Sequence, residues 1–411
     1  MNMRLGSGVK FGVRGGGLCS GAFVNRCKAP SYQRSVSKRH IVSCNGDPEK
    51  SSRGINFLEW SGKLVPQGPI VSGVKSGWKL AWQVMMQELA PQSKDGAFLR
   101  AKYAFGGKIG DPAFPVVPGR YHAYVGNACP WCHRVLLAIA IRGLEGSISH
   151  SYVMDDPERA SRGGWVFDTP DPNFNCRDLR EVYDVCSPGY TGRCTAPLLV
   201  DTVNKSAVCN ESSIITRNLC LSDMPGSNAV DLYPSHLADE IEAMNEKIYD
   251  NVNNGVYRSG FATTQSAYDL AQNQLYSTLD ELEARLGETR FILGDKFTET
   301  DLRLYPTIIR FDVAYATIFK CSKRRISDYP NLQGWLRDVY QLEMPGQSLQ
   351  IGDTFDADDA RRSYSELFPL NPGGIVPSGP TLSDLRLDEP ANRGPSGVSD
   401  VFHMKASVVE A

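Results

Sequence analysis

Apolar residues follow two different periods on either side of a short break in the first half of the chain. Residues 121–125 alternate between apolar and other side chains, which predicts a strand. Residues 135–141 form an apolar stretch that suits one side of a helix. Gly126 and Asn127 interrupt the first pattern and favour a turn. The expected order is strand, turn, helix, and Cys129 stands where the helix begins.

The two periods continue to alternate as far as about residue 225. Further strands are expected at 149–154, 197–201 and 206–209, and further helices at 177–186 and 210–219. The order strand, helix, strand, helix, strand, strand, helix predicts an α/β domain.

The pattern becomes helical beyond residue 226. Spacing near 3.6 predicts helices at 233–249, 266–286, 298–315 and 331–342, with loops at Gly255, Gly287, Gly294 and Tyr329-Pro330. Thr298 and Asp301 are placed to form a capping box at the start of the third of these helices. These features predict a second, all-α domain.

The chain outside these two domains is less regular. A helix is expected at 78–89, ended by Ala90-Pro91. Proline, glycine, aspartate and serine dominate after Met344, so we expect a largely irregular tail whose last 30 or so residues are disordered. The expected boundaries are 1–46 for a leader, 47–118 for an N-terminal extension, 119–225 for the α/β domain, 226–345 for the all-α domain and 346–411 for the tail.

Composition narrows the class of protein. A length of 411 residues accommodates two domains with tails. The net charge of −2 gives no reason to expect nucleic acid as a partner. No apolar run approaches the 18 or more residues of a membrane span, so no membrane partner is expected. Eleven cysteines without a secretory signature indicate functional or buried thiols in a reducing compartment.

The first 46 residues differ from the rest because they contain eight basic residues and no acidic one. They also lack a continuous apolar core of the secretory kind, and the composition is typical of an organelle transit peptide. Residues 41–44 resemble a plastid processing site, which favours the chloroplast stroma over the mitochondrion. The alternative is a basic arm on a protein of the cytoplasm.

Cys129 is the first candidate for chemistry. Unpaired backbone N–H groups and the helix dipole favour a negative atom at a helix start, and such positions lower a thiol pKa from about 8.5 to between about 3.5 and 7.5. Pro130 fits the first helical turn because it lacks an N–H. Cys132 follows one turn later on the same face, close enough for a disulfide with Cys129 after modest adjustment.

Other interpretations of Cys129-Pro-Trp-Cys132-His have less support. The segment matches the haem attachment pattern C-x-x-C-H, but it follows a strand and opens a long apolar helix. A zinc site lacks a second pair of ligands elsewhere in the chain, so no metal is expected. Two cysteines that merely pack in a core are the remaining alternative. The context favours a thioredoxin-like redox thiol or a glutathione-linked thiol.

Two further places suggest a peptide-binding site. Pro197 opens a strand, which suggests a cis peptide bond that leaves the preceding backbone free to pair with a peptide ligand. Glu211 and Ser212 stand at a helix start, where the serine and backbone N–H groups suit a ligand carboxylate and the glutamate suits an ammonium group. Plain N-capping accounts for these two residues equally well.

Several longer segments carry a resemblance to a known family, namely Gly119-Arg-Tyr-His-Ala-Tyr-Val, Cys129-Pro-Trp, Gly164-Trp-Val-Phe, Tyr190-Thr-Gly-Arg-Cys-Thr-Ala-Pro, Asn210-Glu-Ser-Ser, Gly260-Phe-Ala-Thr-Thr-Gln, Arg310-Phe-Asp-Val-Ala-Tyr and Asn371-Pro-Gly-Gly-Ile-Val-Pro. From roughly residue 62 to residue 380 the chain resembles the glutathione transferase superfamily. More narrowly, it resembles the Xi class, the glutathionyl-hydroquinone reductases. The resemblance implies a thioredoxin-like domain followed by an all-α domain, with glutathione as co-substrate, glutathionylated quinols as substrates, and a homodimer formed through the helical domain.

The resemblance also assigns roles to residues. Cys129 would be the catalytic thiol, and Tyr257 and Tyr315 would donate hydrogen bonds to the hydroquinone oxygens. The glutathione-binding set would be Glu211 and Ser212 for the γ-glutamyl end, the backbone of Cys194 or Ala196 next to Pro197 for the cysteinyl part, and Trp165 with Arg193 for the glycyl end. By this resemblance Cys129 takes the glutathionyl group from the substrate, and a second glutathione releases it as glutathione disulfide.

One position departs from the family pattern. Cys132 stands where the family commonly has alanine, so it either resolves the mixed disulfide or stays buried and protonated. The first option favours a glutaredoxin-like thioltransferase or dehydroascorbate reductase that uses Cys129 and Cys132. A non-catalytic glutathione-binding scaffold protein is the other alternative, and Cys129 at a helix start argues against it.

Overall fold

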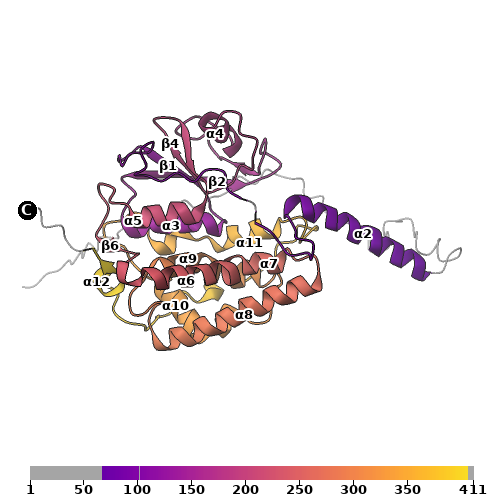
Figure 1. Ribbon diagram of the computed structural model, residues 1–411. Helices are drawn as coiled ribbons and strands as arrows, with labels where there is room; N and C mark the ends of the chain where they lie inside the picture. Colours follow the sequence, from indigo (N-terminus) through magenta and orange to yellow (C-terminus); the bar gives the residue numbers. More distant parts are fainter. Residues whose placement is uncertain (1–66, 101, 406–411) are drawn as a thin grey trace, which may run out of the picture. The chain divides into compact units, whose positions relative to one another are not determined.

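The computed structural model describes residues 67–100 and 102–405 (Figure 1). The expected leader at 1–46, its processing site at 41–44 and the first part of the expected extension lie outside these residues, so the transit peptide stays a prediction.

A five-stranded mixed sheet forms the core of the first domain. The strands, in spatial order, are β3 (Trp165–Val166), β2 (Ile148–Asp155), β1 (Tyr121–Gly126), β4 (Leu198–Asp201) and β5 (Ser206–Cys209). The β1–β2 pair is parallel, whereas the other three neighbouring pairs are antiparallel. The expected strands are confirmed, and the short β3 is an addition. All six residues of β1 are buried: Tyr121, Ala123 and Val125 lie in a core with residues of α3 (Pro130–Arg142), and Tyr124 lies in a second core with residues of α4 (Leu179–Cys186).

Helices on the two sheet faces have different surroundings. On one face lie α3 (Pro130–Arg142) and α5 (Ser212–Leu221), and on the other lies α4 (Leu179–Cys186) (Figure 1). Twelve of the thirteen residues of α3 are buried, because the helix is packed between the sheet and the helical domain. The apolar run that follows Cys129 therefore fixes the helix start between the two domains.

The second domain is helical, as expected. Its main helices are α6 (Ala238–Ile248), α7 (Gly255–Gly260), α8 (Gln265–Glu288), α9 (Glu299–Arg310) and α10 (Pro330–Tyr340), and α9 begins with the expected capping box. Two π-helical turns, η2 (Tyr249–Asn253) and η3 (Phe311–Tyr315), follow α6 and α9. The expected loop at Gly255 is wrong, because that glycine begins α7. This helix packs against α8, and a Cβ at Gly255 would make only ordinary contact with Leu275, at 3.7 Å.

The N-terminal and C-terminal segments contain more structure than the sequence suggested. The expected helix at 78–89 starts earlier, as α2 (Gln67–Leu89). The tail remains largely irregular, but it includes η5 (Ile351–Thr354), α11 (Ala357–Ser365), η6 (Ser383–Leu385) and α12 (Val398–Val401), and its β7 (His403–Met404) pairs with β6 (Val230–Asp231).

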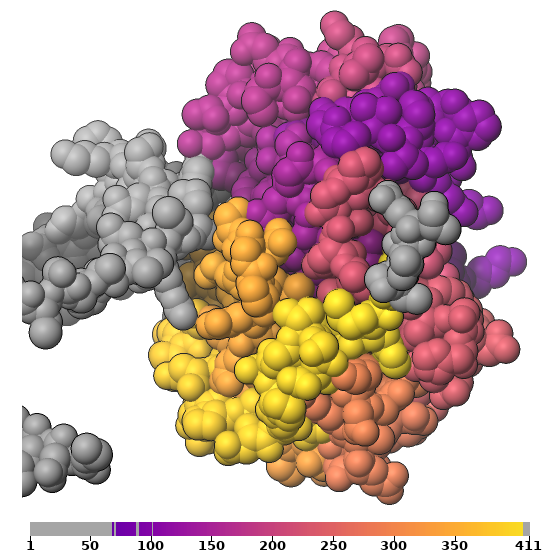
Figure 2. Space-filling model, turned by 90° about the vertical axis from the view of Figure 1, so that its left-hand side faces the viewer, coloured from indigo at the N-terminus to yellow at the C-terminus, as the bar shows by residue number. Residues whose placement is uncertain are grey.

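The expected disorder of the last 30 or so residues is therefore wrong for the described part of that stretch. Figure 2 shows the yellow C-terminal residues lying against the orange helices. Leu385, Leu387 and Phe402 are buried. Gln333 of α10 and Gln341, the residue after that helix, donate side-chain hydrogen bonds to backbone oxygens of the tail. A few buried apolar side chains and hydrogen bonds to backbone carbonyls thus order a segment whose composition alone predicts disorder.

Candidate active site

Cys129 is the N-cap residue of α3, and its side chain is partly exposed. A hydrogen bond from the Cys132 thiol and backbone N–H groups at the start of α3 lower the pKa of the Cys129 thiol to about 7, and the charge of Arg310 adds to this effect. These interactions outweigh desolvation, which opposes ionisation. A large fraction of Cys129 is therefore thiolate near neutral pH, as a nucleophile requires.

The environment of Cys132, unlike that of Cys129, disfavours ionisation of the thiol. Its side chain is fully buried, and burial together with the neighbouring Cys129 raises the pKa of the Cys132 thiol well above its usual value. Both cysteines are free thiols in the structure. A protonated Cys132 serves as a hydrogen-bond donor to the Cys129 thiolate, which fits the expectation of a buried, protonated residue.

Arg310 holds the turn that precedes Cys129, a role that the sequence did not reveal. The side chain is fully buried, and it donates from Nε to Ala128 O at 2.9 Å and from Nη2 to Asn127 O at 3.1 Å. The two carbonyls belong to the loop between β1 and α3. Because the guanidinium is charged, it orients the loop and also favours the thiolate.

A hydrogen-bond chain continues from Arg310 into the C-terminal segment. Arg310 Nη1 lies 2.8 Å from His133 Nδ1, and His133 Nε2 lies 2.7 Å from Thr354 Oγ1. Arginine only donates, so Nδ1 accepts and Nε2 carries the proton. Burial and the charge of Arg310 lower the pKa of His133 well below its usual value, consistent with a neutral ring. Thr354 donates in turn to Ile351 O at 2.6 Å.

Trp165 lies directly against the end of β1. A Cβ at Gly126 would lie 2.5 Å from the Trp165 ring, so only glycine allows this contact. Trp165 itself is half-buried, which leaves part of the ring available beside the turn that leads to Cys129. Arg193, the other residue expected at the glycyl end of glutathione, is exposed in the loop before β4, where its backbone oxygen accepts a hydrogen bond from Tyr190 OH.

The loop before β4 also approaches the thiol. The Ala196-Pro197 peptide bond is cis, which confirms the expectation from the sequence. Cys129 Sγ lies 3.9 Å from Ala196 O. Cys194, in the same loop, is buried, and burial raises the pKa of its thiol, so the side chain is neutral.

Glu211 and Ser212 begin α5, and the capping alternative is realised in the structure. The Glu211 carboxylate accepts a hydrogen bond from Ser213 N at 3.0 Å, and Ser212 Oγ lies 3.5 Å from the same carboxylate oxygen. Ser212 is buried, whereas Glu211 is only partly buried. Capping does not exclude a ligand, because the carboxylate retains acceptor capacity for an ammonium group.

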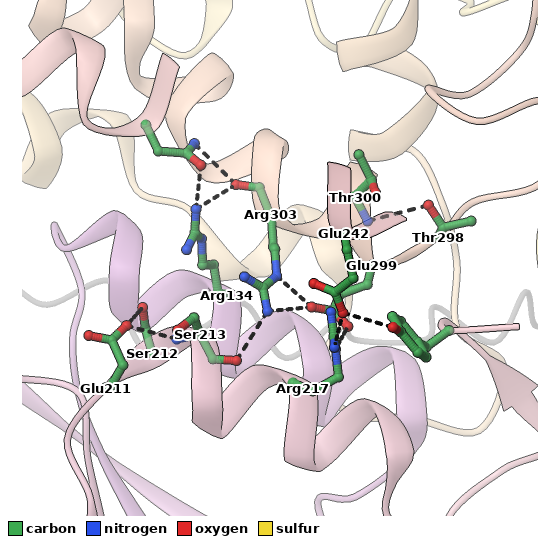
Figure 3. Close-up of polar contacts among 12 residues, drawn as sticks. Arg134, Glu211, Ser212, Ser213, Arg217, Glu242, Thr298, Glu299, Thr300 and Arg303 are labelled. Atoms are coloured by element: carbon green, nitrogen blue, oxygen red, sulfur yellow. Dashed lines mark hydrogen bonds and ion pairs between the residues drawn. The ribbon is translucent and has the colours of Figure 1, made fainter. Parts of the chain in front are cut away.

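Figure 3 shows how this helix start is tied to the second domain. Arg303 of α9 donates to Ser213 O at 3.1 Å and pairs with Glu299, and Glu299 also pairs with Arg217 of α5. Glu299 is fully buried, so the two arginines compensate a charge that would be costly to leave alone. The network fixes α5, and with it Ser212, relative to the helical domain.

The expected tyrosines come together with a third that the sequence analysis did not single out. Tyr364 OH of α11 lies 2.7 Å from Tyr257 OH and 3.0 Å from Tyr315 OH. The Phe319 ring centroid lies 5.2–5.4 Å from the centroids of all three tyrosine rings. A Cβ at Gly260 would lie 2.5 Å from Phe319, so the glycine at the end of α7 makes room for this packing.

The N-terminal extension contributes to the same region. The Arg100 guanidinium lies 3.9 Å from the centroid of the Trp131 ring and 5.5 Å from that of Tyr257. Its Nε donates to Asn254 Oδ1 at 2.9 Å, and the Phe98 ring lies 6.5 Å from that of Tyr257. The aromatic side of the site is thus built from the extension, the helical domain and the tail.

Within residues 67–100 and 102–405, no helix is both long and apolar enough to cross a membrane. The same residues contain no group of three or more histidine, cysteine or acidic side chains that could hold a metal ion.

Comparison with known proteins places this geometry in a family. The model for the N-terminal domain of glutathione S-transferases matches residues 128–220, and the model for the C-terminal domain matches residues 265–338. Together the two matches contain Cys129, the Glu211-Ser212 helix start and Tyr315.

Similar proteins and structures agree with this match. The chain is 41% identical to glutathionyl-hydroquinone reductase PcpF of Sphingobium chlorophenolicum, over 76% of this chain and 96% of that protein. The glutathione-bound structure of YqjG from Escherichia coli K-12 is 41% identical, with a TM-score of 0.63 and coverage of 74% of this chain and 94% of that one. The Xi glutathione transferase of Phanerochaete chrysosporium is 38% identical, with a TM-score of 0.63 and coverage of 70% and 94%. The chain therefore belongs to the Xi class of the glutathione transferases, the glutathionyl-hydroquinone reductase family.

Proposed function

We propose that this enzyme reduces glutathionyl-hydroquinones to hydroquinones, with glutathione as reductant and a mixed disulfide on Cys129 as intermediate. The observation that carries the proposal is a partly exposed, readily ionised thiol whose charge acts on the hydroxyl of Tyr257, raising its pKa, with two further phenol hydroxyls beside Tyr257. A thiolate alone suits many thiol exchange reactions. The phenols add hydrogen-bond donors for an oxygen of an aromatic substrate.

The reaction balances in two steps. The Cys129 thiolate attacks the sulfur of the glutathionyl group while the ring is in its keto form, so that a disulfide bond forms and the carbon–sulfur bond breaks. The electron pair moves through the ring to the keto oxygen, which takes a proton and becomes a hydroquinone hydroxyl. A second glutathione thiolate then attacks the glutathionyl sulfur, releases glutathione disulfide and restores the Cys129 thiolate.

The tyrosines suit the proton-donor role in the first step. Burial raises the pKa of Tyr257 and, more strongly, that of Tyr315, so both hydroxyls keep their protons at neutral pH. Each is therefore a donor when the ring oxygen gains negative charge. Glu211 and Ser212 would bind the γ-glutamyl end of glutathione, with Trp165, Arg193 and the cis Ala196-Pro197 segment along the rest of the tripeptide.

A glutaredoxin-like thioltransferase or dehydroascorbate reductase is the second candidate. The observation that favours it is the direct hydrogen bond between Cys132 and Cys129, because a neighbouring thiol is placed to displace glutathione. The raised pKa of the Cys132 thiol opposes this role, since the thiol form is a poor nucleophile.

One experiment separates the two candidates. The double variant Tyr257→Phe with Tyr315→Phe is assayed on a glutathionyl-hydroquinone and on a simple glutathione mixed disulfide, which has no ring oxygen to protonate. The proposal expects a loss of about 100-fold or more on the first substrate and little change on the second. Equal survival of both activities would contradict the hydroquinone assignment. Mass spectrometry during turnover then shows whether Cys129 carries glutathione or is joined to Cys132.

We also propose a homodimer, on the basis of the family. Light scattering of the purified protein tests it, with a mass of two chains as the expected result and a single chain as the contradicting one.

The basic leader supports a further proposal, that the protein is imported into plastids. A reporter fused to residues 1–46 is expected inside plastids, whereas diffuse cytosolic signal or mitochondrial signal would contradict the assignment.

A further inference from the structure

The proposed reaction needs a place for a second glutathione, and the chemistry restricts its direction of approach. In the first step Cys129 attacks the glutathionyl sulfur from the side opposite the ring carbon, because displacement at sulfur is close to linear. In the second step the incoming thiolate must lie opposite Cys129 Sγ on that same sulfur. The second glutathione therefore enters on the side that the hydroquinone leaves, which the proposed function puts beside Tyr257.

An open cavity lies beside Tyr257, between the N-terminal extension, η2, α7 and α8. Its volume of about 390 Å³ is in the range usual for small-molecule sites. Phe98 and Arg100 line the cavity, and so does Arg258, the residue that follows Tyr257. The Phe98 ring lies 6.5 Å from the Tyr257 ring, and the Arg100 guanidinium lies 5.5 Å from the centroid of that ring. We propose that this cavity binds the second glutathione, which discharges the Cys129 mixed disulfide.

The charges of the cavity complement those of glutathione. At neutral pH glutathione carries two carboxylates and one ammonium group. The cavity is lined by the guanidinium groups of Arg100 and Arg258 and by the carboxylate of Asp250. Arg258 Nη1 donates to the backbone oxygen of Asp250 at 3.4 Å, and within the described residues neither side chain forms an ion pair. Both charges are therefore available for charge-assisted hydrogen bonds to a ligand.

An amide oxygen adds an acceptor to these charges. Gln274 of α8 lines the cavity, and its Oε1 is buried without a hydrogen-bond partner in the part of the chain that the structure describes. A buried acceptor without a donor costs free energy, so a ligand that brings an N–H group is favoured. The peptide N–H groups of glutathione are donors of this kind.

Arg100 is held in place at the end of the cavity that lies closest to the thiol. Its Nε donates to Asn254 Oδ1 at 2.9 Å, and its guanidinium lies 3.9 Å from the centroid of the Trp131 ring. Trp131 is two residues after Cys129, and the charges of Cys129 and Arg100 both act on the hydroxyl of Tyr257. A ligand carboxylate at Arg100 would thus lie near the catalytic helix start.

The step regenerates the enzyme without a further reagent. The thiolate of the second glutathione attacks the glutathionyl sulfur, so a new sulfur–sulfur bond forms and the bond to Cys129 Sγ breaks. The electron pair of the broken bond stays on Cys129 Sγ, which becomes a thiolate again, and glutathione disulfide leaves.

The test is Arg258→Met, measured on each half-reaction separately. Hydroquinone release in a single turnover without free glutathione reports the first step and is expected to stay within about twofold of wild type. The rate constant for discharge of the mixed disulfide by glutathione is expected to fall about 5- to 20-fold, because a charge-assisted contact is lost. Discharge by 2-mercaptoethanol, a small thiol without carboxylates, is expected to change less than about twofold. A merely structural defect would slow both thiols alike.

Arg285→Met is the matched control. Arg285 is also a partly buried arginine of the helical domain whose Nη1 donates to a backbone oxygen, that of Ile292 at 3.5 Å, but it does not line the cavity. It is expected to leave both half-reactions unchanged. Thermal unfolding of the two variants shows whether they lose stability to a similar extent.

The inference rests on the proposed function, and the two fail in different ways. If the wild-type enzyme releases no hydroquinone, the proposed function fails, and the cavity is still tested on a mixed disulfide formed with glutathione disulfide. If Arg258→Met is discharged by glutathione at the wild-type rate, if it is slowed alike with both thiols, or if Arg285→Met loses as much, the second glutathione site is overturned.

Discussion

The thiol side of the active site comes from one continuous motif, whereas the aromatic side is assembled from segments far apart in the chain. Cys129 and its hydrogen-bond donor Cys132 are three residues apart on one helix start. Tyr364 is 107 residues from Tyr257 and 49 from Tyr315, and the three meet only when α7, η3 and α11 pack together. Local geometry at the helix start supplies most of the first side, to which Arg310 adds a contact from the helical domain, whereas the second side depends on tertiary packing throughout.

This difference predicts how substitutions divide. Changes at the thiol side should affect every substrate that exchanges with glutathione. Changes at the tyrosines of the aromatic side should affect only substrates with a ring oxygen that must be protonated. Arg310 is the exception, because it belongs to the helical domain but acts on the thiol side.

Replacement of the nucleophile is expected to have the largest effect. Cys129→Ser substitutes an alcohol, which ionises far less readily than a thiol, for a thiol whose pKa is lowered to about 7. Activity on glutathionyl-hydroquinones and on mixed disulfides is expected to fall together, by about a thousandfold or more. Steady-state assays with both substrates measure this. A variant that kept full turnover on either substrate would place the chemistry elsewhere.

Arg310→Met is expected to have the next largest effect, on both stability and the thiol. The variant leaves Ala128 O, Asn127 O and His133 Nδ1 without their donor, at a cost of about 3 kcal/mol or more. The pKa of the Cys129 thiol is expected to rise, because a nearby positive charge is lost. Thermal unfolding and the pH dependence of thiol alkylation measure the two effects.

Arg290→Met is the control for that variant. Arg290 is a partly buried arginine in another part of the helical domain, where it forms an ion pair with Asp338. It should lower stability without changing the pKa of Cys129. If the two variants changed thiol alkylation to the same extent, the specific role of Arg310 would be wrong.

Ser212→Ala is expected to weaken glutathione binding. Loss of one hydrogen bond from a buried hydroxyl should raise the KM for glutathione about three- to tenfold, with a smaller change in kcat. Ser213→Ala, at the neighbouring and less buried position, is the control and should leave KM unchanged. If Ser212→Ala left the KM for glutathione unchanged, Ser212 would have no role in binding and would serve only to pack the start of α5.

Cys132→Ser is expected to have the smallest effect. Serine keeps a donor for the Cys129 thiolate, so turnover with glutathione should stay within about twofold of wild type. Cys132→Ala removes that donor and should raise the pKa of Cys129, because the hydrogen bond from Cys132 is the largest cause of its lowering. If Cys132→Ser abolished turnover on disulfides, Cys132 would be a resolving thiol.

The sequence was most informative where function depends on local geometry. The strand, turn and helix around Cys129, the N-capped start of α5 at Glu211 and the cis bond before Pro197 all follow from short-range patterns, and the structure confirms them. The period of apolar residues also gave most helices of the second domain.

Other features depend on contacts that no local pattern encodes. In the sequence, Arg310 is an ordinary arginine of a helix. Only packing brings it against Ala128 O, 182 residues away in the chain. Tyr364 lies in a segment whose proline, glycine and acidic composition favoured an irregular tail. Gly255 predicted a loop from its residue type alone, but it begins α7, which packs against α8. In each case packing outweighed local propensity.

The most direct test of the account is the ionisation of one sulfur. Thiolate absorbance is titrated in the wild type and in Cys129→Ser, and the difference isolates Cys129 from the other ten cysteines. For an acid whose pKa is lowered in the folded protein, the ionised form should appear as pH rises through that lowered value. A transition near pH 7 is expected, since the pKa of Cys129 is lowered to about 7. A transition at about 8.5 or above, as for an ordinary cysteine, would contradict the central claim.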